Sequence, residues 1–341
     1  MAFFNKLLGE GSGHSPYYPS FIQGATLVPR CLWFVEPPDD RPLNQDIPFL
    51  RTAKSAKASA KDPWKVEVER TVEKDFLYGT ALAEDILPFA VRKLLLVVLP
   101  VAERNGKLIM LLQEDILAEG APFASDWVKR SESIWDKRRK DKEQSAFDRL
   151  NYNNLLSNQN SKAKFTVLYN KSGTNLVAAY LAASECKKVN HLAVSGFVAD
   201  HVTYRYYADT EDHALYLVGV LNSTIVNEAI KPYQSQGLMG ERDIHRRPFE
   251  VCTIPLFDPQ NPLHQKIVQV ARDAREKMLK WKSKIGGNAA QAREAARNIV
   301  RPEIDQLDEL VAHLLKGQAL ASRSSRKGLS LTPFLFGRAE S

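Results

Sequence analysis

The sequence predicts an α+β protein in which a region of mixed β and α structure is followed by a helical C-terminal unit. Two patterns support this fold class. Short segments before residue 210 alternate apolar and polar side chains, which is typical of half-buried strands. Beyond residue 260, apolar residues recur every three or four positions, as on the buried face of an amphipathic helix.

Residues 1–120 are expected to form a β-rich unit. The segment GATLVPRCLWFVEP (24–37) is interpreted as a strand, and WKVEVERT (64–71) alternates valines with charges. The apolar segments 92–101 and 106–113, joined through AERNG, are predicted to form a β-hairpin.

Two charged segments are expected to connect units. Residues 51–64 (RTAKSAKASAKDPW) are rich in Lys, Ala and Ser, a composition typical of a mobile connector. Residues 121–160 lack glycine and proline from Ser125 onward and carry a basic middle. They are predicted to form one long linking helix with Ser125 as its cap.

Residues 161–260 are expected to form a mixed α/β unit. Strands are predicted at 164–173, 201–210 and 249–258. The segment 175–185 is compatible with a helix or a strand. Residues 211–233 are predicted to be helical, with Ser223 capping a second helix.

Residues 261–317 are expected to form the C-terminal helices. One helix is predicted to begin near Asn261, and a further helix pair is predicted to break near Pro302. The basic, Ser-rich tail 318–341 is expected to be disordered.

Charge favours an acidic partner, with nucleic acid first. Lys plus Arg is 47 against 40 for Asp plus Glu, which gives a net charge of +7. The three cysteines form no CxxC pair, so a zinc ribbon or a disulfide framework is not expected. The longest apolar run, 94–102, is too short to span a bilayer. We expect a cytoplasmic protein without a membrane partner.

Common catalytic motifs are missing from the sequence. It contains no Walker phosphate loop, no G-x-S-x-G elbow and no H-E-x-x-H helix. Glu73 and Lys74 give a loose match to a metal-dependent nuclease motif, although a solvated strand face explains them as well.

The strongest candidate for a binding surface is the turn 237–247 (GLMGERDIHRR). Its arginines, Arg242, Arg246 and Arg247, suit contacts with phosphates or base edges, because a guanidinium can form two parallel hydrogen bonds with either. The alternative is structural: Asp243 would cap a short helical turn and Arg242 would pair with a nearby acid.

Other polar residues could belong to the same surface. Gln234 and Gln236 precede the turn, and glutamine can recognise adenine. Lys171 and Ser172 lie in a second polar turn and could hold a phosphate. Arg205 alternates with tyrosines on a strand, so either it or the tyrosines face solvent. A polar loop after a helix also explains the glutamines, and a plain hairpin turn explains Lys171 and Ser172 equally well.

The order of several segments resembles a known family. These segments include FIQGATLVPRCLWFVE, LYGTALAEDILPF, LYNKSGTN and LNSTIVNEAI, followed by GERDIH and IPLFD. The chain is similar, over roughly residues 16–285, to the C-terminal region of bacterial adenine-N6 DNA methyltransferases. These enzymes belong to restriction–modification and related phage-defence systems, and some are fused to an endonuclease. The resemblance implies a mixed β/α target-recognition domain followed by helices.

The sequence departs from complete enzymes of that family. It lacks the Gly-rich motif for S-adenosylmethionine and the N/D-P-P-Y/F motif, and its one double proline stands in VEPPDD. The resemblance therefore implies a specificity half without the catalytic half. We expect no cofactor in this chain and S-adenosylmethionine in a separate methyltransferase catalytic domain or subunit.

The resemblance and the residues together predict sequence-specific recognition of duplex DNA. The expected contacts are Lys171, Ser172, Arg205, Gln234, Gln236, Arg242, Arg246 and Arg247. Two alternatives stay open. One is a protein–protein adaptor that docks a catalytic methyltransferase subunit through the helices between Leu263 and Leu315, and the other is a metal-dependent nuclease that uses Glu73.

Overall fold

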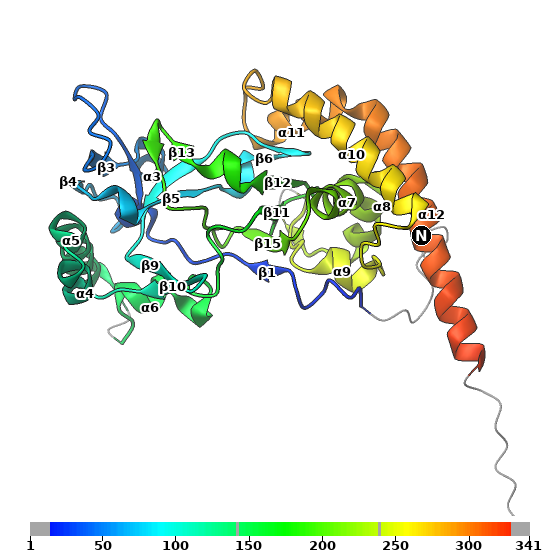
Figure 1. Ribbon diagram of the computed structural model, residues 1–341, viewed down its shortest axis with the longest axis horizontal. Coiled ribbons are helices and arrows are strands. Elements are labelled where there is room, and N and C mark those ends of the chain that lie inside the picture. Colours follow the sequence, from blue (N-terminus) through cyan, green and yellow to red (C-terminus); the bar gives the residue numbers. More distant parts are fainter. Residues whose placement is uncertain (1–13, 141–142, 238–239, 329–341) are drawn as a thin grey trace, which may run out of the picture.

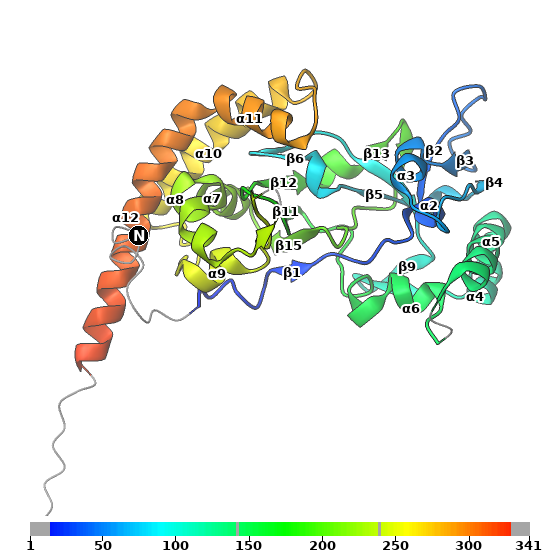
Figure 2. The same ribbon diagram turned by 180° about the vertical axis from the view of Figure 1, so that it is seen from behind.

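The computed structural model describes residues 14–140, 143–237 and 240–328. Its mixture of helices and antiparallel sheets is an α+β fold, as predicted. Figure 1 shows an elongated molecule with two lobes, and Figure 2 shows the same division from behind. The first lobe surrounds a five-stranded sheet, and the second surrounds a four-stranded sheet and the C-terminal helices. None of the described helices is both long and apolar enough to cross a membrane.

The sheet of the first lobe is antiparallel throughout. In spatial order its strands are β4 (Glu69–Thr71), β3 (Phe49–Thr52), β2 (Phe34–Glu36), β8 (Leu95–Val98) and β5 (Leu77–Thr80). The short helix α2 (Arg30–Trp33) precedes β2, so the expected strand 24–37 is wrong in its first half. The valines of 64–71 are buried as expected, although the strand begins only at Glu69.

The predicted hairpin exists with a different first strand. β9 (Val101–Arg104) pairs with β10 (Lys107–Met110), and Arg104 lies opposite Lys107. Asn105 and Gly106 form the turn, with φ values of 54° and 75°. Such a two-residue turn requires positive φ at both positions, which Asn-Gly tolerates well. Most of AERNG is therefore strand, and β8 pairs with β2 and β5 instead.

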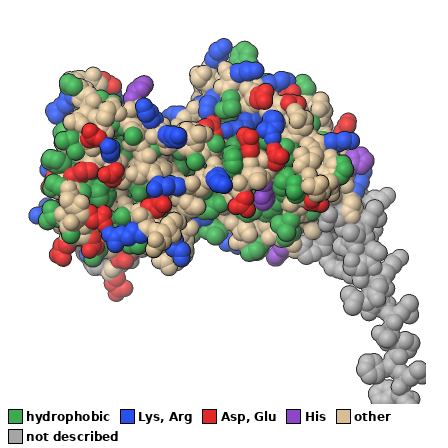
Figure 3. Space-filling model, viewed as in Figure 1, with side chains coloured by type: hydrophobic (Ala, Val, Ile, Leu, Met, Phe, Trp, Pro, Cys, Tyr) green, Lys and Arg blue, Asp and Glu red, His purple; other side chains and the backbone are tan. Residues whose placement is uncertain are grey.

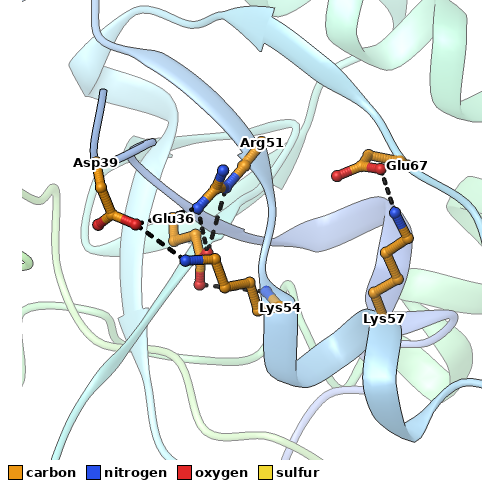
Figure 4. A network of polar contacts seen from close by, with 6 residues as sticks. All are labelled: Glu36, Asp39, Arg51, Lys54, Lys57 and Glu67. Atoms are coloured by element: carbon orange, nitrogen blue, oxygen red, sulfur yellow. Dashed lines mark hydrogen bonds and ion pairs between the residues drawn. The ribbon is translucent and has the colours of Figure 1, made fainter. Parts of the chain in front are cut away.

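The segment 51–64 is ordered rather than a mobile connector. It contains the end of β3 and the helix α3 (Lys54–Ser59). Figure 4 shows the ion pairs around it: Arg51 and Lys54 contact Glu36 and Asp39, and Lys57 contacts Glu67. Together these contacts fasten both ends of α3 to neighbouring segments.

The expected single helix over 121–160 is two helices. α5 (Pro122–Arg138) begins at a proline, and the Glu73 carboxylate accepts hydrogen bonds from the backbone N–H groups of Phe123 (2.9 Å) and Ala124 (2.6 Å). Ser145 starts α6 (Ala146–Leu150) with a reciprocal capping box to Asp148. This second cap inside the segment starts a separate helix. The short helix α4 (Gln113–Ala118) packs beside α5.

The sheet of the second lobe is also antiparallel. Its strands in spatial order are β1 (Ile22–Gln23), β15 (Thr203–Ala208), β11 (Phe165–Asn170) and β12 (Ala178–Ala182). The predicted strands at 164–173 and 201–210 are therefore confirmed, and the ambiguous segment 175–185 is largely a strand.

Each face of this sheet is covered. One face packs against α7 (Glu211–Asn222) and α8 (Thr224–Ile230), and the Ser223 hydroxyl caps α8 as predicted by accepting from Val226 N. The other face meets the ribbon of β6 (Ile86–Leu87) and β7 (Ala90–Val91).

Short elements connect the larger ones in both lobes: η1 (Lys74–Phe76), η2 (Ala83–Asp85), η3 (Tyr152–Asn154), η4 (Ala183–Cys186), η5 (Lys231–Tyr233), β13 (Lys188–Val189) and β14 (Leu192–Ala193).

The predicted strand at 249–258 is wrong. Residues Arg247–Val251 form the helix α9, with Pro248 in its first turn, and the described chain continues without a strand. Proline favours the first turn of a helix because its φ is already helical and its missing N–H has no partner there. Phe249, Cys252 and Ile254 are buried as the apolar pattern required.

Three helices complete the second lobe. Asn261 caps α10 (Pro262–Trp281) as predicted, and α11 (Ala289–Ile299) is followed by α12 (Arg301–Gly328). The helical path breaks at Val300 and α12 begins at Arg301, one residue before Pro302, as the predicted break requires. α12 continues to Gly328, which corrects the expected disorder of 318–328, and residues 329–341 lie outside the described part.

Candidate nucleic-acid interface

The two polar turns singled out in the sequence are joined through their backbones. The carbonyl of Lys171 accepts hydrogen bonds from Ile244 N (3.1 Å) and His245 N (2.9 Å). Gly173 N donates to Arg242 O (2.9 Å), and Ser172 and Asp243 form an isolated antiparallel bridge. The loop after β11 and the arginine-rich turn therefore form one surface, which we call the joined turns (residues 170–175 and 234–247).

Gln234 holds this surface together from inside. It is 6% exposed, and its side-chain amide donates to Gly173 O (3.0 Å) and Arg242 O (3.4 Å). Arg242 N in turn donates to Ser235 O (3.0 Å). Gln234 therefore positions the two turns, and its amide nitrogen is occupied by the chain itself.

Asn170 shapes the smaller turn. It is fully buried, and its amide donates to Ser172 O and Asn175 O, both at 3.0 Å. Its side-chain carbonyl accepts from Val177 N (2.8 Å). The sequence signal for this role is an asparagine at the end of a strand, directly before Lys-Ser-Gly, since asparagine side chains commonly bond turn backbones.

Arg242 is exposed at the edge of the joined turns. It follows a two-residue ribbon in which β16 (Gln236–Gly237) pairs with β17 (Gly240–Glu241). Its side chain lies against Gly237, where a Cβ atom would overlap the Nε and Cδ atoms of the arginine. Gln236 is exposed beside it. Arg242 and Lys171 form no ion pair within the described part of the chain.

The other two arginines are engaged differently. The Arg246 guanidinium lies over the ring of Tyr18, 5.2 Å from its centroid. Arg247 pairs with Glu250 at 2.9 Å. In this turn it is therefore Arg247, and not Arg242, that has a nearby acid partner. Both side chains are half-buried.

Asp243 does not cap a helix. Its carboxylate accepts a hydrogen bond from the Ser235 hydroxyl, which lowers the pKa of the Asp243 carboxyl. The imidazole of His245 lies 3.5 Å from the same carboxylate. The acid therefore fixes the turn and reduces its positive charge.

A buried aromatic base supports the joined turns. The Tyr169 hydroxyl donates to His245 O (2.7 Å), and the rings of Tyr169 and Tyr204 stack at 5.3 Å with an interplanar angle of 6°. Burial raises the pKa of both tyrosines, so they stay neutral over the usual pH range. His245 takes a φ of 42°, which this set of backbone bonds maintains.

Arg205 does not belong to this surface. It is 2% exposed on β15, it donates to Asn158 O at 3.2 Å, and burial lowers the pKa of its guanidinium. The tyrosines on either side face the helices, while residues near Asn158 cover Arg205. The structure thus brings together all of the candidate residues except Arg205: Lys171, Ser172, Gln234, Gln236, Arg242, Arg246 and Arg247.

The acids proposed for a nuclease are used structurally. Both Glu73 carboxylate oxygens cap α5, and Lys74 pairs with Asp46. Within the described residues, no group of three or more His, Cys, Asp or Glu side chains could hold a metal ion.

Comparison with solved structures gives a weak structural likeness. No protein-family description and no curated protein sequence matches the chain. A solved structure of the Type IIL restriction-modification enzyme MmeI in complex with DNA aligns with a TM-score of 0.44 and 13% identity. The alignment covers 75% of this chain and 31% of that one, so the chain spans about a third of the enzyme's length. A likeness at this level assigns neither a family nor a function.

Proposed function

We propose that the chain recognises duplex DNA through the joined turns. The observation that carries the proposal is the backbone pairing of two polar turns from distant parts of the sequence, which places Lys171, Ser172, Gln236 and Arg242 on one surface. Lys171 and Arg242 lack an ion-pair partner among the described residues, so a phosphate or a guanine edge can take that place.

The side chains divide into two kinds of contact. Lys171 and Ser172 suit phosphate oxygens and would set the register of the chain on the duplex. Arg242 and Gln236 are exposed at the edge and suit base edges in the major groove. Arg246 adds positive charge to the same turn, whereas the charge of Arg247 is paired with Glu250. Arg205 and Gln234 are omitted as direct contacts because they are buried.

The catalytic partner is the second part of the proposal. The resemblance to adenine-N6 methyltransferases supports a role as the specificity part of a methyltransferase or restriction–modification assembly. The catalytic domain or subunit would bind S-adenosylmethionine and take the adenine out of the duplex. The residues of this chain would select and hold the DNA site.

The adaptor alternative has less support. The apolar residues of the C-terminal helices, such as Ile267, Ala271, Leu307 and Val311, are fully buried in the second lobe. They are therefore committed to packing within the chain. The nuclease alternative loses its central residue, because Glu73 caps α5.

Fluorescence anisotropy across a salt series tests the proposal. A labelled, randomised duplex library is titrated with the purified chain. The duplexes that the chain binds are then separated and sequenced. We expect salt-sensitive binding with enrichment of a short site containing adenine. The double variant Lys171→Ala/Arg242→Ala should weaken binding and relax the sequence preference, and the loss of the Lys171 phosphate contact should reduce the slope of log affinity against log salt by about one.

A matched control separates local contacts from net charge. Lys137 and Arg130 lie on α5 in the first lobe, so Lys137→Ala/Arg130→Ala removes the same charge at a distance from the joined turns. We expect a smaller change from this control. An equal loss of affinity in both double variants would reject the joined turns as the contact surface.

A further inference from the structure

A second surface, separate from the joined turns, lies in the first lobe. A cavity of about 480 Å³ opens between the start of α2, the end of α3, the end of α5 and α6. Cavities of several hundred cubic ångströms commonly hold small organic ligands. The chain segments that enclose it come from four separate parts of the sequence.

The cavity wall carries positive charge. The lining residues include no Asp or Glu within the described part of the chain, and they include the cations Arg30, Lys61, Arg138, Arg139, Lys140 and Arg149. Arg30 and Arg139 have acid partners outside the lining, Asp200 at 3.4 Å and Asp136 at 3.1 Å. Lys61, Lys140 and Arg149 have none among the described residues. Cations gathered in a partly enclosed site attract an anion.

Two indole rings lie in the wall of the same cavity. Trp64 and Trp135 both line it, and their rings stack at 5.1 Å with an interplanar angle of 29°. Aromatic faces of this kind bind nucleobases by stacking. Trp135 is held in place because its indole N–H donates to Gln144 O at 2.8 Å.

The cavity is formed before any ligand arrives. Arg138 donates to Pro63 O and Arg139 donates to Gln144 O, both at 2.7 Å, which ties the end of α5 to both neighbouring segments. The Lys57–Glu67 ion pair in Figure 4 secures α3 on the opposite wall. A site fixed in this way loses little conformational freedom on binding.

We propose that this cavity binds a nucleoside phosphate, with the base against Trp64 and the phosphate between Lys61 and Arg149. The combination of stacked indoles and unpaired cations matches both halves of such a ligand. S-adenosylmethionine does not fit, because its sulfonium and ammonium groups would face cations without a carboxylate. The proposal does not depend on DNA binding by the joined turns. The nucleotide can be free or can be the phosphorylated end of a strand.

Calorimetry and quenching of tryptophan fluorescence test the proposal with the full chain. The probes are adenosine 5′-monophosphate, adenosine, inorganic phosphate and a short single-stranded oligonucleotide with a 5′-phosphate. We expect the monophosphate or the oligonucleotide to bind at least about tenfold more tightly than adenosine or phosphate alone. Binding of the monophosphate assigns a free nucleotide, and binding of the oligonucleotide alone assigns a strand end.

Variants locate the site. Lys61→Gln and Arg149→Gln should each weaken binding about tenfold, because each removes a charge-assisted hydrogen bond. Trp64→Leu should weaken the nucleotide and leave inorganic phosphate unchanged. Lys137→Gln, at an exposed neighbour outside the cavity lining, is the matched control and should bind normally.

The outcomes separate this site from the joined turns. Arg242→Ala should keep full nucleotide affinity, even if it abolishes duplex binding. The proposal is overturned if the folded wild-type chain binds none of the probes, or if Lys61→Gln and Arg149→Gln bind the nucleotide as tightly as Lys137→Gln does. Circular dichroism of each variant verifies folding.

Discussion

The side-chain amide of Asn222 bonds the backbone of Ala178 in both directions. Ala178 N donates to the Asn222 carbonyl oxygen at 3.0 Å, and the Asn222 amide donates to Ala178 O at 2.8 Å. Both residues are fully buried. A side chain on α7 thus satisfies backbone groups of β12 that have no neighbouring strand on that side.

Replacing Asn222 with leucine should destabilise the second lobe. The change leaves the N–H of Ala178 buried without a partner, while its C=O still accepts from Phe89 N at 2.9 Å, so the free energy of unfolding should fall by about 2 kcal/mol. Urea unfolding measures it. Asn298→Leu is the control, because Asn298 is exposed on α11. Equal stability of the two variants would show that this pair of hydrogen bonds contributes little.

Gly219 allows α7 and α10 to approach closely. A Cβ atom there would lie 3.0 Å from Ile267 Cγ2 and 3.2 Å from Ala271 Cβ. We expect Gly219→Val to force the helices apart and to lower the free energy of unfolding by about 2 kcal/mol. Gly317→Ala on α12 meets no atom within 4 Å and should not destabilise the chain. Thermal unfolding of both variants compares the sites.

Gly237 should matter for binding rather than for stability. An alanine there would overlap the Arg242 side chain and force it to move. If Arg242 contacts DNA, Gly237→Ala should weaken duplex binding about as much as Arg242→Ala does, with a change in unfolding free energy below about 1 kcal/mol. Anisotropy titrations beside urea unfolding give both quantities. Unchanged DNA affinity in Gly237→Ala would place the functional arginine elsewhere.

Two histidines, the half-buried His213 and the buried His264, should make stability depend on pH. Burial lowers the pKa of His213 and of His264 below their ordinary value of 6.5. Well above pH 6.5 both are neutral in either state and contribute no pH dependence. As the pH falls below 6.5, the unfolded chain takes up protons that the folded chain does not, so the free energy of unfolding falls.

The slope of this decline identifies the residues. We expect His213→Gln/His264→Gln to flatten the pH dependence of unfolding between pH 6.5 and the lowered folded-state values. Chemical denaturation at a series of pH values measures the slope. His313, exposed on α12, provides the comparison variant His313→Gln, which should keep the wild-type slope. A double variant with that same slope would assign the effect to other groups.

Features encoded by neighbouring residues were predicted correctly. The cap at Ser223, the start of α10 at Asn261 and the strand at 201–210 each depend on a local pattern. The errors occurred where two patterns competed. Residues 249–258 alternate like a strand, yet Pro248 starts a helix there. Residues 121–160 have a composition that favours a helix throughout, yet Ser145 caps a second, separate helix within them.

For the candidate site, too, features with a local sequence pattern were predicted, and features that depend on residues far apart in the sequence were not. Both polar turns were identified from the sequence, but their backbone pairing joins residues about seventy positions apart and has no local signal. The position of Arg205 depends on Asn158, which covers a strand face that alternation alone would leave exposed. The six cations of the cavity come from four segments, so their meeting follows from the fold.

The chain passes repeatedly between the lobes. Tyr17 and Phe21 belong to the core of the second lobe, residues from Ala25 onward belong to the first, and Leu87 returns to the second before Leu96 lies in the first again. Each lobe is thus assembled from interleaved stretches of the gene. Exchange of one lobe by recombination would therefore require several crossovers rather than a single one.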